Sequence, residues 1–235
     1  MSKLWTVAAS HSTLPNVQLE ARFLRQRDRF EHQVIVVTPQ GELPCLTSLE
    51  GNDQESFPPS PPLQDMSVER RVGSQVALGV GMAGSALWSL SALADAADGS
   101  LLFDWACQTR GAAVWPQNCY LWSSHDPAAN SASTEVVLCR WRPLEGAEIQ
   151  VVLTLLASPL TKPLSYSVGP AGRGMLPAGY TAASQELIPT TNSDFAVNDP
   201  GRGTVLSITG SSTTPDALAT KSATLRWQYR IAIRQ

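Results

Sequence analysis

The sequence has little charge and very little lysine. Charged residues make up 16% of its 235 residues, and only three of the 17 basic residues are lysines. The formal net charge is −3. Proteins that bind nucleic acids or anionic membranes concentrate basic side chains on one surface, and this composition offers no such concentration. We therefore expect neither a nucleic-acid partner nor a membrane partner.

Cysteine and histidine are scarce and widely separated. The sequence has four cysteines and three histidines: Cys45, Cys107, Cys119, Cys139, His11, His32 and His125. Zinc sites usually take ligands from closely spaced pairs such as C-x-x-C, and no such pair occurs. We predict no metal and no cofactor. Cys107 and Cys139 lie in apolar strand patterns and are expected to be buried free thiols, although one or two disulfides remain an alternative.

Targeting and membrane signals are also weak. The first residues lack the apolar core of a signal peptide, so a cytoplasmic location is the expectation. The stretch Val72–Ala94 carries no charge, but it contains four glycines and four serines. Its modest hydrophobicity and the absence of flanking basic clusters argue against a membrane helix.

The clearest positive signal is an alternation of apolar and polar residues at the C-terminus. Leu225, Trp227, Tyr229, Ile231 and Ile233 are separated by single residues, two of which are arginines, and a third arginine, Arg234, follows Ile233. A period of two is typical of a strand with one face on the core. We predict a long strand here. If it lies at a sheet edge, its arginines would protect that edge, or a second copy would pair with it.

Similar patterns recur along the chain. Val17–Phe23 and Phe30–Val36 alternate around a polar turn and predict a hairpin. Further strands are expected at Met66–Val72, Val76–Val80, Leu101–Gln108, Asn118–Ser123, Thr134–Arg142, Glu148–Leu156 and Gly203–Thr209. The expected fold is all-β: an antiparallel β-sandwich or flattened barrel with long loops and at most one or two short helices. We expect a single domain over residues 1–235, with irregular segments near 50–65 and 169–200.

One motif carries two interpretations. Gly79, Gly81 and Gly84 form a G-x-G-x-x-G pattern after an apolar run, and Asp104 follows 20 residues after Gly84. In a dinucleotide-binding fold the glycines would approach a pyrophosphate and the aspartate would bind the ribose. That fold needs alternating strands and helices, which the rest of the sequence does not predict. We favour a structural turn between antiparallel strands, with Trp88 and Leu90 directed inward.

The remaining candidate contacts with a ligand are dispersed. Trp115 lies outside any regular pattern. His125 and Asp126, in a predicted loop, could act as a base and its orienting acid, although adjacent side chains rarely point together. Arg226 and Arg230 lie on the polar face of the C-terminal strand, where they would be solvated or would bind an anionic ligand or partner.

The runs Pro58–Gln64 and Val76–Gly84 together resemble uncharacterised β-rich bacterial proteins. The resemblance implies no activity and transfers no functional residue. The preferred hypothesis is a non-catalytic domain that binds a small molecule or a protein, or that assembles with itself as a homo-oligomer. The alternative is a small-molecule enzyme that uses the Gly79–Gly84 loop for a nucleotide or sugar derivative.

Overall fold

The structure is a computed structural model that describes most of the chain. The described residues are 4–50, 58–110, 117–122, 134–142, 148–156, 164–170, 204–210 and 222–235. Within these ranges it contains fourteen β-strands and no helix. Every strand pair is antiparallel.

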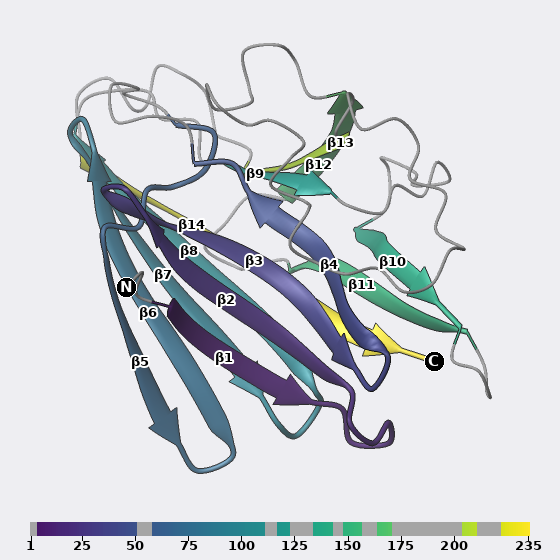
Figure 1. Cartoon of the computed structure of the whole chain (residues 1–235). Helices are drawn as coiled ribbons and strands as arrows, with labels where there is room; N and C mark the ends of the chain where they lie inside the picture. The colour runs from purple at the N-terminus through teal and green to yellow at the C-terminus, as the bar shows by residue number, and fades with distance from the viewer. Residues whose placement is uncertain are drawn as a thin grey trace.

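The strands form two seven-stranded sheets that face each other (Figure 1). Sheet A runs in the order β1 (Leu4–Ser10), β2 (Gln18–Gln26), β3 (Arg29–Thr38), β4 (Gly41–Ser48), β9 (Gln117–Trp122), β13 (Thr204–Gly210) and β12 (Leu164–Pro170). Sheet B runs in the order β10 (Glu135–Trp141), β11 (Ile149–Leu156), β14 (Ser222–Arg234), β8 (Ser100–Arg110), β7 (Ala86–Asp95), β6 (Ser74–Ala83) and β5 (Asp65–Arg71). The sheets do not close into a barrel, so the predicted antiparallel β-sandwich is confirmed.

Alternating burial follows the alternating sequence. In β14, Trp227, Tyr229, Ile231 and Ile233 are buried. Arg226, Arg230 and Arg234, on the opposite face of the strand, are exposed. The predicted N-terminal hairpin is also confirmed, because β2 pairs with β3 from Gln18 opposite Val37 to Gln26 opposite Arg29. The inner faces of both sheets meet in one large apolar core.

The position of β14 corrects one expectation. Instead of lying at an edge, β14 pairs with β11 on one side and β8 on the other. Its length and its apolar face give it the largest area to bury, which an interior position provides. Its arginines therefore protect no sheet edge, and a second copy cannot pair with it.

Three strands lie outside the sequence-based expectation: β1, β4 and β12. β4 contains Gly41 and Pro44, which both disfavour strands. A β-bulge accommodates the proline, because the pairing with β3 shifts between Val34 opposite Leu46 and Ile35 opposite Pro44. The long-range pairing of β4 with β3 and β9 outweighs its local preferences.

The glycine motif lies in an antiparallel hairpin. β6 pairs with β7 along its whole length, and no helix begins at Ser85. Trp88 and Leu90 are buried, as predicted. The turn itself is shorter than expected: Gly79 and Gly81 lie inside β6, and only Gly84, with φ of +56°, lies in the turn.

Gly79 and Gly81 make room for an extended segment, Pro58–Gln64, which we call the proline segment. It runs across one end of the sandwich between β4 and β5 (Figure 1). The Cys119 N–H donates to the carbonyl of Pro59 over 3.2 Å, and the Gln64 N–H donates to the carbonyl of Val80 over 2.8 Å. The segment thus joins β9 of sheet A to β6 of sheet B.

The close approach explains the glycine at position 81. A Cβ placed there would lie 1.8 Å from the carbonyl oxygen of Pro62, which is backbone and cannot turn aside. We expect Gly81→Ala to lower the free energy of unfolding by about 3 kcal/mol or more, as overpacking against a fixed neighbour does. Chemical denaturation monitored by tryptophan fluorescence measures the loss.

Gly73→Ala is the matched control. Gly73 has φ of +74° but no atom within 4 Å of an added Cβ. Alanine there should cost about 1 to 2 kcal/mol through backbone strain alone. Equal losses at the two positions would contradict the proposed role of Gly81.

Candidate functional site

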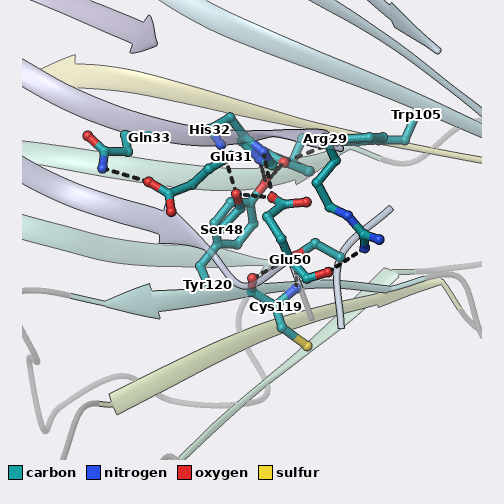
Figure 2. Close-up of polar contacts among 11 residues, drawn as sticks. Arg29, Glu31, His32, Gln33, Ser48, Glu50, Trp105, Cys119 and Tyr120 are labelled. Carbon is teal, nitrogen blue, oxygen red and sulfur yellow. Dashed lines mark hydrogen bonds and ion pairs between the residues drawn. The ribbon is translucent and has the colours of Figure 1, made fainter. Parts of the chain in front are cut away.

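A connected group of polar side chains lies inside the sandwich. Four members are His32 of β3, Ser48 of β4, Glu50 just after β4 and Tyr120 of β9 (Figure 2). Tyr229 of β14 is the fifth, and we call the group the His32 cluster. His32 and Tyr229 are 0% exposed and Tyr120 is 1% exposed. Buried polar groups at this depth are costly unless they find partners.

Hydrogen bonds link the cluster across the two sheets. The imidazole Nε2 of His32 lies 2.8 Å from the hydroxyl of Tyr120. The Tyr120 hydroxyl contacts the Tyr229 hydroxyl, and the Nε1–H of Trp105 donates to Tyr229 over 3.2 Å. Because β3 and β9 belong to sheet A while β8 and β14 belong to sheet B, this chain of contacts crosses the core.

The chemistry of Trp105 sets a direction for the chain. An indole N–H can only donate, so the Tyr229 oxygen accepts from it. Tyr229 can then donate to Tyr120, and Tyr120 to Nε2 of His32. In this arrangement the imidazole proton is on Nδ1, which lies 3.8 Å from Oε1 of Glu50. Every hydroxyl in the chain then donates one hydrogen bond and accepts one.

At the other end, Glu50 is held by short contacts. The Ser48 hydroxyl donates to Oε1 of Glu50 and accepts the backbone N–H of His32 over 2.9 Å. The guanidinium of Arg29 donates to the Glu50 backbone carbonyl over 2.9 Å. Arg29 forms its ion pair with Asp28, so its charge does not directly neutralise the Glu50 carboxylate. Oε2 of Glu50 has no hydrogen-bond partner.

Burial changes the ionisation of both titratable groups. Desolvation lowers the pKa of His32 to about 3, so its imidazole is neutral at pH 7. Desolvation raises the pKa of Glu50 to about 8, opposed in part by the hydrogen bond from Ser48. At neutral pH the core therefore holds a neutral histidine beside a largely protonated carboxylic acid.

This geometry does not suit nucleophilic catalysis. A serine nucleophile needs its hydroxyl bonded to the imidazole, but the Ser48 hydroxyl contacts Glu50 and the backbone of His32. The imidazole nitrogen that makes a hydrogen bond uses it on Tyr120. No part of His32 is exposed for a substrate to reach. The arrangement instead orders the interior and stores a proton on Glu50.

The ionisation of Glu50 generates a pH prediction. The folded pKa of about 8 exceeds the unfolded value of 4.5, so the unfolded state loses this proton first as the pH rises. Glu50 thus contributes stability that is complete below pH 4.5 and is lost as the pH rises through 8. Glu50→Gln should remove a decline on the order of 3 kcal/mol between pH 4.5 and pH 7.

The measurement is the free energy of unfolding by urea at pH intervals across that range. Glu69→Gln is the control, because Glu69 is exposed on the edge strand β5. His32 acts in the opposite direction, since its lowered pKa reduces stability as the pH falls below 6.5. An unchanged slope in the Glu50→Gln variant would show that Glu50 is ionised in the folded protein.

The predicted surface arginines form local ion pairs. Arg226 binds the carboxylate of Asp104 with Nε at 2.8 Å, and Arg230 lies 3.0 Å from Asp98. Arg234 pairs with Glu135 at 2.7 Å. Asp104 is the residue that a dinucleotide site would use to bind the ribose. In the structure its carboxylate pairs with Arg226 on the outer face of sheet B. As ligand contacts, Arg226 and Arg230 remain predictions.

The glycine motif lies away from the His32 cluster. Gly79, Gly81 and Gly84 belong to the β6–β7 hairpin, and the described residues contain no helix whose N-terminus could bind a phosphate beside them. Trp115, His125 and Asp126 lie outside the described residues. As ligand contacts, these three residues remain predictions.

Sequence reasoning missed the members of the His32 cluster as a group. The sequence signal was slight: His32 and Tyr229 each occupy an inward position of an alternating strand, where an apolar residue is the common choice. Their contact partners are 88 and 109 residues away along the chain. Only the pairing of the sheets reveals the contacts.

Comparison with known proteins assigns the chain to no family. The chain matches no protein-family model, and no curated protein is significantly similar to it. Among the described residues, no cluster of three or more His, Cys, Asp or Glu side chains could hold a metal ion. The same residues include no helix that is long and apolar enough to cross a bilayer.

Proposed function

We propose that this chain is a non-catalytic interaction domain that associates with a second copy of itself. The observation that carries the proposal is a group of exposed apolar side chains on the outer face of sheet B. Val80 and Met82 of β6 and Leu87 of β7 are 54%, 53% and 51% exposed. We call them the hairpin patch.

Strand pairing places the three side chains together. Val80 and Met82 are two residues apart in β6 and so share one face of the sheet, and Leu87 lies directly opposite Met82. Polar, exposed residues surround them: Gln64, Asp65, Ser89 and Gln108. An apolar centre with a polar rim is characteristic of protein interfaces.

Two features favour a second copy as the occupant. The hairpin patch is uncharged and can face the same patch of another molecule about a twofold axis. Arg226, on the same face, is already paired with Asp104, so its charge does not oppose the approach of a second such face. The cytoplasmic location expected from the sequence belongs to the same proposal and agrees with four free thiols.

The test is the molar mass in solution by light scattering over a wide range of concentrations. We expect a dimer of the 25.2 kDa chain that dissociates on dilution. Met82→Glu should weaken association at least tenfold, because two carboxylates would be desolvated at the centre of the interface. The folded state should be unaffected, since Met82 is half exposed.

Val72→Glu is the matched control. Val72 is an exposed apolar residue in the turn between β5 and β6, outside the hairpin patch. The Val72→Glu substitution should leave the dissociation constant of the dimer unchanged. A monomer at all concentrations would reject self-association, and a dimer that persists in the Met82→Glu variant would reject this surface.

A further inference from the structure

Two cysteine thiols meet across the sandwich. Cys45 lies in β4 of sheet A and Cys139 lies in β10 of sheet B, and their sulfur atoms are 3.3 Å apart. Cys45 is 0% exposed and Cys139 is 8% exposed. The two positions are 94 residues apart in the sequence, so the contact depends on the packing of the two sheets.

A β-bulge in each strand produces this contact. In β4 the pairing with β3 passes over Cys45, and in β10 the pairing with β11 passes over Leu138. Each strand therefore buries two consecutive side chains, Cys45 with Leu46 and Leu138 with Cys139. Bulges commonly redirect side chains toward functional positions. Without the bulges, regular alternation would turn one residue of each pair away from the core.

The other two cysteines have different surroundings. The Cys119 thiol lies 3.4 Å from the hydroxyl of Ser207, and burial raises the pKa of Cys107 to about 12. Neither thiol has a sulfur partner, although all four cysteines are buried. This difference makes Cys107 and Cys119 internal controls for any reaction of the pair.

We propose that Cys45 and Cys139 are an oxidation site at which a peroxide forms a disulfide between sheets A and B. The sulfur atoms must approach by about 1.3 Å to reach the bond length of about 2.0 Å. Cys139 is the more exposed of the two residues, so we assign the first reaction to it. Only a small oxidant such as hydrogen peroxide suits a sulfur with so little exposure.

The reaction balances in two steps. The Cys139 thiolate attacks one peroxide oxygen, the O–O bond breaks, and Cys139 becomes a sulfenic acid as hydroxide leaves and takes up the thiol proton as water. The Cys45 sulfur then attacks the Cys139 sulfur, the S–OH bond breaks, and the Cys45 proton leaves with the hydroxyl as a second water. Two thiols are oxidised to one disulfide, and one peroxide is reduced to two waters.

The contact between the two thiols also indicates which of them reacts second. The hydrogen bond with Cys139, together with burial, raises the pKa of the Cys45 thiol well above its ordinary value. Cys45 therefore stays protonated beside Cys139 and acts as the resolving thiol once the sulfenic acid forms.

The experiment treats the full chain with hydrogen peroxide and counts free thiols by alkylation of the denatured protein. The intact mass should fall by two hydrogen atoms, and two cysteines instead of four should be alkylated. Peptide mapping should find the Cys45 and Cys139 peptides joined. The melting temperature should rise by roughly 5 to 10 °C and return after dithiothreitol.

Variants separate this pair from general oxidation. Cys107→Ala with Cys119→Ala should retain the reaction, and Cys45→Ala or Cys139→Ala should abolish it. If the alanine variants fail to fold, peptide mapping of the unaltered chain still decides. A mass gain from added oxygen without a cross-link, or a cross-link that includes Cys107 or Cys119, would overturn the proposal.

Discussion

The contact between the hydroxyl groups of Tyr120 and Tyr229 is the constraint around which the interior is arranged. Each hydroxyl is buried between the sheets, and an unpaired one would cost about 1 to 3 kcal/mol. His32 and Trp105 supply the remaining partners from the two sheets. The same side chains provide stacking, since the ring centroids of Phe103 and Tyr229 are 5.1 Å apart. The polar chain therefore fixes how sheet A is placed over sheet B.

That placement requires local departures from regular strand geometry. The bulges of β4 and β10 bring Cys45 and Cys139 together at one part of the core. At another part, Gly81 lets the carbonyl of Pro62 approach the sheet. The proline segment then closes the end of the sandwich, where its carbonyl at Leu63 accepts the Phe30 N–H over 2.7 Å. These irregularities are the means by which two regular sheets make specific contacts.

The sequence predicts the strands in which buried and exposed residues alternate. It predicts few of the contacts that depend on how these strands pair. β14 and the β2–β3 hairpin are evident because a period of two is a local property. β4 is not, because Gly41 and Pro44 disfavour a strand, and the bulge that accommodates Pro44 depends on the pairing with β3. The His32 cluster is even harder to predict from the sequence. Its groups come from β3, from β4 and the residues just after it, from β9 and from β14. The pKa values of His32 and Glu50 depend on burial that no single stretch of sequence determines.

The division between interior and surface bears on where function can reside. The pKa values of His32 and Glu50 are strongly shifted because both groups lie in the core, where the shift follows from desolvation and is not itself a sign of catalysis. On the outer face of sheet B the arginines Arg226, Arg230 and Arg234 are each paired with a carboxylate. Their charges are satisfied within the chain, which leaves the exposed apolar side chains of the β6–β7 hairpin as the part of that face that gains most from leaving water. The proposed recognition by apolar contact therefore depends on these surface side chains and not on the ionisable groups of the interior.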